Sequence, residues 1–212
     1  MNALFLFFAD NMGDIKLRLL EHVRIVGVAL LLAIPFGITV GIALSRGWAR
    51  TIRGPVFYLL GLGQTIPSLA LLALAVGLLG VGLVPAVIAL LLYSILPIAR
   101  NCYTGIQSVP DGAVDAARGL GMTGWQILRS VELPLAGAYI IAGIRTATVV
   151  AISAGALASL IGAGGLGDFI FAGISLYKPE EMLAGAIPTA LLALGADFGL
   201  SLLEKRLERW RR

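Results

Sequence analysis

The stretch DAARGLGMTGWQILRSVELP, residues 115–134, differs in character from everything on either side of it. It carries mixed charge and several small residues, so it is too polar to cross a lipid bilayer. Strongly hydrophobic segments precede and follow it. The chain therefore combines membrane spans with one substantial polar segment, and that segment is the first candidate for a functional element.

Local signals in and just before this stretch predict two short helices joined by a glycine bend. Pro110-Asp111-Gly112 is a turn signal that starts the first helix, and Gly119 and Gly121 break it. Thr123 is a suitable N-cap for the second helix, which Leu133-Pro134 is expected to stop. The product is a compact knob (residues 115–134) with one apolar side. On spacing alone, it suits docking on a partner and lying on lipid about equally.

The composition is that of a polytopic membrane protein. The chain has 212 residues, of which 58% are hydrophobic and 13% charged, and its mean hydropathy is +0.94. Soluble domains carry about 25% charged residues. The net charge of +4 comes from basic residues spread over loops and tail, which argues against nucleic acid as a partner. Cys102 is the single cysteine, so an internal disulfide and a zinc or redox motif are excluded.

Five segments are apolar and long enough to cross a bilayer, which takes about 20 residues in a helix. They are Ile25–Leu44, Val56–Leu79, Leu83–Arg100, Ala138–Ile161 and Met182–Leu203. We therefore predict an all-α fold with about five transmembrane helices in a single domain, residues 1–212. The amphipathic segment 1–24 is expected to lie as a helix at the membrane surface, with His22 wet at the interface.

Basic residues predict the orientation of the spans. The connections after the first, third and fifth spans carry eleven lysines and arginines, and the other side carries four. The positive-inside rule makes the first side cytoplasmic. Segment 101–137 with the knob and the basic tail 204–212 are thus expected in the cytoplasm, whereas segments 1–24 and 162–181 lie outside. Three tryptophans also fall on the cytoplasmic side, where indoles anchor at headgroups: Trp48, Trp125 and Trp210.

Small residues recur every four positions in the fourth span: Gly143, Ala147, Ala151, Gly155 and Ser159. Such a stripe lets another helix approach closely. Packing within the chain, a subunit interface and a translocation path are all compatible with it.

Polar residues interrupt the second span at Gln64-Thr65-Ile66-Pro67-Ser68. Backbone freed by Pro67 is tolerated in a membrane only where protein or water satisfies it. Transporters place their pathways at broken helices of this kind. A simple proline kink in a packed helix fits equally well.

Two charged residues lie inside predicted spans, Arg145 in the fourth and Asp197 in the fifth. Charges at such depth are costly and are usually paired or functional. A mutual ion pair is one hypothesis. Snorkelling of both side chains toward the cytoplasmic interface is the other.

Motifs for enzymatic chemistry are missing. Residues 162–167 read GAGGLG and match G-x-G-x-x-G, but a membrane span precedes them instead of a strand, so we reject a dinucleotide site. An external loop that moves with a gate or contacts a partner is the better interpretation. None of Lys16, Lys178 and Lys205 follows a glycine, so the chain has no Walker A loop. We expect no catalytic residues, metal site or cofactor in this chain.

The knob resembles the EAA motif, the cytoplasmic loop with which ABC-importer permeases dock on their ATPase. That motif reads Glu-Ala-Ala, three residues, Gly, nine residues, Ile-x-Leu-Pro. Here Asp115-Ala116-Ala117, Gly121 and Val131-Glu132-Leu133-Pro134 match it, with Asp115 in place of Glu and Val131 in place of Ile. Both departures preserve charge or shape.

Five further segments are similar to the permease subunit of osmoprotectant ABC importers, which carry glycine betaine, carnitine and choline. They are residues 64–72, 92–101, 142–148, 161–168 and 185–188. The resemblance implies a type I ABC-importer permease fold in the inner membrane of a prokaryote. It also implies two ATPase subunits that bind ATP and Mg²⁺, a second permease copy or a related permease, and an external substrate-binding protein.

The same resemblance assigns roles to residues. Coupling to the ATPase would use Asp115, Ala116, Ala117, Gly121, Leu133 and Pro134. From polarity we assign a weakly binding path to Gln64, Pro67, Ser68, Thr146, Thr148 and Ser153, with selectivity mostly in the binding protein. A permease for methionine or another amino acid is the first alternative, and a channel-like subunit without ATP coupling is the second.

Overall fold

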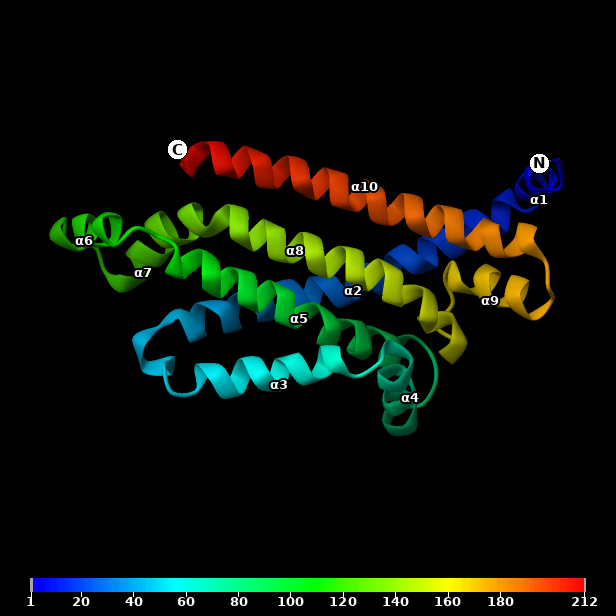
Figure 1. Ribbon diagram of the computed structural model, residues 1–212, viewed down its shortest axis with the longest axis horizontal. Coiled ribbons are helices and arrows are strands. Elements are labelled where there is room, and N and C mark those ends of the chain that lie inside the picture. Colours follow the sequence, from blue (N-terminus) through cyan, green and yellow to red (C-terminus); the bar gives the residue numbers. More distant parts are fainter. Residues whose placement is uncertain (1, 212) are drawn as a thin grey trace.

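Four long helices lie side by side and set the shape of the molecule (Figure 1). They are α2 (Met12–Ser45), α5 (Leu83–Gln107), α8 (Leu133–Gly155) and α10 (Pro179–Arg211). The structure is a computed structural model that describes residues 2–211, and side chains over residues 4–208. Within residues 2–211 all regular structure is helical, which confirms the predicted all-α class.

Shorter helices complete the fold. They are α1 (Asn2–Asp10), α3 (Arg53–Thr65), α4 (Ser68–Leu79), α6 (Asp111–Gly119), α7 (Gly124–Ile127) and α9 (Gly167–Ser175). A 3₁₀ turn covers Gly47–Ala49, a π turn Leu128–Glu132 and a second 3₁₀ turn Ala156–Ile161.

By length and composition, four helical segments of the described chain can cross a membrane: α2, α5, Gly124–Ile161 and α10. A fifth crossing requires α3 and α4 to count together, although they meet at an angle of 97°. The predicted second span is therefore a bent pair of helices. Pro67 causes the break, because it lacks the amide hydrogen that would continue α3.

Helix α5 lies at the centre of the bundle. Leu90 and Ile98 of this helix are almost fully buried, and they belong to two apolar clusters shared with α2 and α8. Ile25 and Ala29 of α2 and Ala151 of α8 meet Leu90 in the first cluster. Burial of these side chains fixes the register of α2 and α8 on α5.

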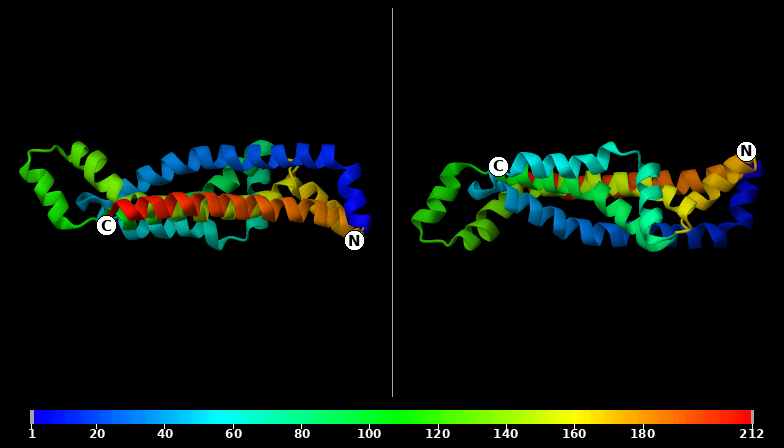
Figure 2. Two further views of the ribbon diagram at one scale, coloured as in Figure 1. Left: turned by 90° about the horizontal axis from the view of Figure 1, so that it is seen from above. Right: turned by 90° about the horizontal axis from the view of Figure 1, so that it is seen from below.

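The two ends of the bundle differ. The knob and the end of α10 lie at one end, and α1 and α9 lie at the opposite end (Figure 1). Figure 2 shows the knob projecting past the ends of the long helices. The connection 46–53 also lies at the knob end, so the basic connections fall together as the sequence predicted. Arg212 and the side chain of Trp210 in the basic tail lie outside the described residues.

Several expectations about element boundaries were wrong. Helix α2 begins at Met12 and not at Ile25, so much of segment 1–24 continues directly into the first span. Leu133-Pro134 does not stop a helix. Pro134 lies just after the π turn and within one continuous helix that runs from Gly124 to Ile161. Part of the loop 162–181 folds as α9, which Gly173 brings into contact with the backbone of Met182.

His22 is fully buried, contrary to the expected wet side chain. Its Nε2 lies 3.0 Å from the carbonyl oxygen of Ile152, in the last turn of α8, and its Nδ1 has no hydrogen-bond partner. Gly155 and Gly165 leave the space for the ring. The amphipathic pattern around His22 was misread because α8 and the segment around Gly165 cover this polar position of α2.

An ionic network lies beside His22 and joins α2 to α9. Arg18 Nη1 is 2.9 Å from Glu21 Oε2 and 2.8 Å from Asp168 Oδ2, and Glu21 accepts a hydrogen bond from the amide of Gly165. Burial raises the pKa of the Asp168 carboxyl, and Arg18 opposes that rise. Segment 162–166 is therefore tied to the start of α2 by side-chain contacts.

Candidate functional site

The knob is built on a helix ending that depends on Gly121. Helix α6 closes with the amide of Gly121 bonded to the carbonyl of Arg118 and the amide of Met122 bonded to the carbonyl of Ala117. This is a Schellman ending, with Gly121 in the left-handed region at φ 76°. A β-carbon at Gly121 would meet nothing within 4 Å, so the glycine is needed for its backbone conformation and not for close packing.

Helix α7 begins with the predicted N-cap. Thr123 Oγ1 accepts from the amide of Gln126 at 3.4 Å, and Gln126 Oε1 accepts from the amide of Thr123 at 2.7 Å. This reciprocal capping box fixes the direction of the chain after the bend. A π turn then leads into α8.

The matched coupling residues fall on different sides of the knob. Asp115, Ala116, Gly121 and Pro134 are exposed, whereas Ala117 is buried and Leu133 is half-buried against the core of α5 and α8. Asp115 pairs with Arg118 at 3.0 Å on the surface.

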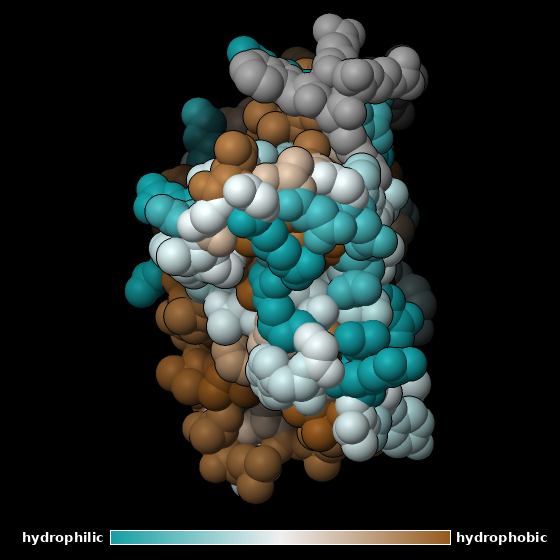
Figure 3. Space-filling model, turned by 90° about the vertical axis from the view of Figure 1, so that its left-hand side faces the viewer, coloured by the Kyte–Doolittle hydropathy of each residue, from teal (hydrophilic) through white to brown (hydrophobic). Residues whose placement is uncertain are grey.

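Two large apolar side chains stand out on the knob. Leu120 is 83% exposed and Trp125 is 67% exposed. Seen from this end, polar side chains cover the middle of the face, and apolar side chains gather toward its lower edge (Figure 3). The knob thus exposes both large apolar and polar side chains to its surroundings.

A bidentate ion pair attaches the base of the knob to α2, and the sequence analysis missed it. Arg46, which follows α2, donates from Nη1 to Glu132 Oε1 at 3.0 Å and from Nη2 to Oε2 at 2.6 Å. Glu132 is only 8% exposed, in the π turn before α8. The available signal was the charge of Glu132, which occupies the variable position of the apolar ending Val131-Glu132-Leu133-Pro134.

A cavity of about 550 Å³ opens where α3 meets α4. Four of the six residues predicted for the path line it: Gln64, Pro67, Ser68 and Ser153. The structure does not bring the other two there. Thr146 lines a separate cavity, and Thr148 is buried with its hydroxyl bonded to the carbonyl of Ile144 at 2.8 Å.

Tyr93 also lines the cavity at the helix break, and sequence reasoning missed it. Its hydroxyl donates to the carbonyl of Ile66, and its own carbonyl accepts from Gln64 Nε2 at 2.9 Å. Pro97, four residues after Tyr93, was the available signal that the Tyr93 carbonyl needs a partner from outside the helix.

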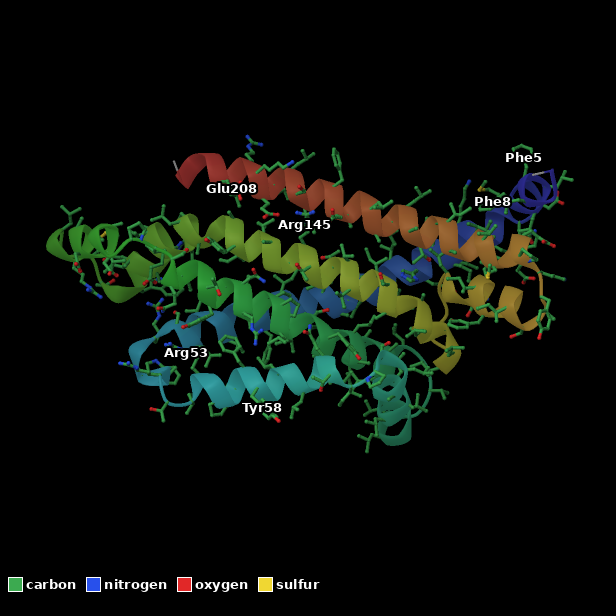
Figure 4. All side chains as sticks on the ribbon, in the orientation of Figure 1. Phe5, Phe8, Arg53, Tyr58, Arg145 and Glu208 are labelled. Carbon is green, nitrogen blue, oxygen red and sulfur yellow. The ribbon has the colours of Figure 1, made fainter. Side chains whose placement is uncertain are left out.

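Arg145 pairs with Asp197, as the ion-pair hypothesis stated. The Nε–Oδ1 distance is 2.5 Å and the Nη2–Oδ2 distance is 2.8 Å. Glu204, one further residue of α10, accepts from Arg145 Nη1 at 3.2 Å. Arg145 lies between α8 and α10 (Figure 4), beside a cavity of about 330 Å³ that these three residues share with Thr146.

The small-residue stripe of the fourth span packs within the chain. Ala147 and Ala151 are fully buried, and a β-carbon on Gly143 would lie 2.7 Å from Asn101 Cβ of α5. Gly155 faces Val26 of α2 in the same way. Of the interpretations left open, close approach of α5 and α2 to α8 is the one this geometry supports. Ser159 lies past the helix end, where its hydroxyl bonds to the carbonyl of Ala156.

Comparison with known proteins gives concordant matches. The profile of the family described as binding-protein-dependent transport system inner membrane component matches residues 33–209. The glycine betaine/carnitine/choline transport system permease protein OpuCB of Bacillus subtilis is 44% identical, over 98% of this chain and 94% of that protein. The choline transport system permease protein OpuBB of the same organism is 42% identical over the same shares.

Among solved structures, an inward-facing conformation of the MetNI methionine ABC transporter matches with a TM-score of 0.82. The match covers 92% of this chain and 97% of that chain at 22% identity. At this level of identity the likeness establishes the fold.

Proposed function

Because this chain belongs to the family of binding-protein-dependent transport system inner membrane components, we propose that it is the permease subunit of an ATP-driven importer of compatible solutes such as glycine betaine, choline or carnitine. One observation carries the proposal. Identity of 44% with a permease named for these three solutes extends over 98% of the chain.

The chain is an inner-membrane protein that works with a partner ATPase, a substrate-binding protein and a second permease. We infer two ATPase subunits, which bind ATP and Mg²⁺, and a second permease that is another copy or a related chain. ATP hydrolysis belongs to the partner, and this chain supplies the path and the mechanical link.

The knob is the proposed link to the ATPase. Its exposed Leu120 and Trp125 and the exposed part of the matched motif offer a docking surface at the end of the bundle. The Arg46–Glu132 pair and the continuous helix from α7 into α8 offer a rigid connection from that surface to the spans. Movement of the ATPases would then rock the helices as a unit.

The cavity at the α3–α4 break is the proposed segment of the path. Polar groups of Gln64, Ser68 and Ser153 face it in an otherwise apolar bundle. Few strong interactions are available there, which suits a path that a solute must leave as readily as it enters.

The second candidate function is a permease for methionine or another amino acid. The likeness to the methionine transporter favours it, but that likeness shows the fold alone at 22% identity. A channel-like subunit without ATP coupling is a third interpretation, and the knob argues against it.

Uptake of labelled glycine betaine, choline and carnitine tests the proposal, in cells at high osmolarity with and without this gene. We expect the deletion to lose uptake, the wild-type gene to restore it, and Gly121→Asp to insert normally without restoring it. Unchanged uptake of all three solutes, with methionine uptake lost, would move the assignment to the amino-acid permease. Normal uptake by Gly121→Asp would contradict the coupling role of the knob.

A further inference from the structure

Pro97 leaves one backbone carbonyl of α5 without its helical partner. Proline has no amide hydrogen, so the carbonyl of Tyr93, four residues earlier, receives no bond from the helix. Gln64 fills this position from outside α5, with Nε2 at 2.9 Å from the Tyr93 oxygen. The side-chain amide thus substitutes for the missing backbone amide.

Tyr93 makes a second bond across the same break, in the opposite direction and to Ile66. Ile66 connects α3 to α4 in an extended conformation, with φ −72° and ψ 128°. Its carbonyl oxygen accepts a hydrogen bond from the hydroxyl of Tyr93. Gln64 and Tyr93 therefore close a reciprocal clamp between the helix break and α5.

At this end the side-chain hydrogen bond from Gln64 attaches α3 to α5, and Ile66 and Leu71 add apolar packing beside Tyr93. None of the residues of α3 is buried, and this helix lies at the margin of the bundle (Figure 1). At its other end Phe57 meets Tyr103 edge to face at 5.4 Å, and the Arg53 guanidinium lies 4.8 Å from the centre of the same ring. Tyr58, between these points, turns away from the bundle (Figure 4). The clamp is thus the polar attachment nearest to the cavity.

We propose that Gln64 is a positioning residue: by replacing the amide hydrogen that Pro97 lacks, it holds the bent α3–α4 pair on α5 and so keeps the cavity formed. This role differs from direct contact with a solute, which polarity alone suggested for Gln64. The uptake test of the proposal rests on the transport function proposed above, whereas the distance test does not.

A double-mutant cycle separates the two roles. Gln64→Met removes the donor at nearly constant size, and Pro97→Ala gives the Tyr93 carbonyl a backbone donor of its own. In the intact transporter we expect Gln64→Met to lower maximal uptake about fivefold, the factor that corresponds to one lost hydrogen bond, with KM nearly unchanged. In the Pro97→Ala background the same change should cost less than about twofold.

Spin labels give a readout that is independent of the transported solute. They are attached at Ser68→Cys and Ser153→Cys, which both line the cavity, after Cys102→Ala removes the single native cysteine. We expect Gln64→Met to broaden the distance distribution between the labels, and Pro97→Ala to reverse that broadening. Gln107→Met is the matched control, because Gln107 also bonds a carbonyl, that of Ser45, but far from the break.

Tyr93→Phe provides a second test of the clamp, which can be used if the Pro97→Ala variant does not assemble. Loss of the hydroxyl should broaden the distribution in either background, because Pro97→Ala supplies no donor to Ile66. An equal effect of Gln64→Met in both backgrounds, or unchanged distances in both Gln64→Met and Tyr93→Phe, would overturn the proposal. If the wild-type transporter takes up none of the solutes while the expected distance changes are observed, only the proposed transport function is contradicted.

Discussion

Gly121 ends α6 in a backbone conformation that other residues adopt at a cost of about 1–2 kcal/mol. Space around its α-carbon is open, so a small side chain is penalised through φ and not through a clash. We expect uptake to fall in the order Gly, Asn, Val at this position, because Asn tolerates the left-handed region better than a β-branched residue. Gly124→Ala is the control, since Gly124 also has open space but lacks a positive φ. Equal losses at positions 121 and 124 would contradict the conformational explanation.

The Arg145–Asp197 pair makes a second prediction at this scale. Arg145→Ala and Asp197→Ala should each lower the yield of folded protein, because either one leaves a charge without its main partner in the membrane. The double variant should recover part of the yield, measured by size-exclusion chromatography in detergent. Recovery will be incomplete, because Glu204 also loses its bond to Arg145. Simply additive losses would argue against the pair.

The contacts of some residues can be predicted from the sequence alone, and those of others cannot. Thr123 was predicted as a cap because a cap signal is local. The Arg145–Asp197 pair was one of two hypotheses, because an intramembrane charge can be paired or can snorkel to the interface. His22 and Tyr93 escaped prediction because their partners, Ile152 and Gln64, are distant in the chain. The sequence shows where a proline leaves a backbone carbonyl without its helical partner, but it does not show which side chain donates to that carbonyl.

At the scale of elements, α8 depends on its small residues to lie close to α5. A β-carbon at Gly143 would approach Asn101 Cβ at 2.7 Å and the Pro97 carbonyl oxygen at 2.8 Å, and backbone atoms cannot move aside. We expect Gly143→Ala to destabilise the protein by about 1–3 kcal/mol, seen as a lower melting temperature in detergent. Gly137→Ala is the matched control on the same helix, since its β-carbon would meet only the flexible end of Leu207 at 3.4 Å.

Periodicity identified the elements well and their ends poorly. The hydrophobic segments located α2, α5, α8 and α10, because burial in lipid and protein requires long apolar helices. Periodicity did not predict that α2 starts at Met12 or that the helix continues across Pro134. Polar residues at the end of a bundle remain helical when a neighbouring element covers them. A break or a kink at Pro67 was foreseen, but the angle of 97° between α3 and α4 was not.

At the scale of the whole molecule, the bundle separates two ends that the sequence had assigned to opposite sides of the membrane. The knob and the basic connections share one end, and α1 and α9 share the other (Figure 1). The distribution of lysines and arginines predicted this grouping, because the positive-inside rule assigns connections rich in basic residues to one side of the membrane. The assembly with a second permease leaves no comparable mark, since one chain supplies only half of such an interface.

Thiol labelling tests the predicted orientation of the whole chain. Leu120→Cys places a thiol on the knob, and Val81→Cys places one in the turn between α4 and α5, where Val81 is 76% exposed. Native Cys102 is fully buried and should stay silent. With a membrane-impermeant maleimide we expect position 81 to react in intact spheroplasts and position 120 only after permeabilisation. The reverse pattern would place the knob outside, where no ATPase could reach it, and would remove the basis of the proposed coupling.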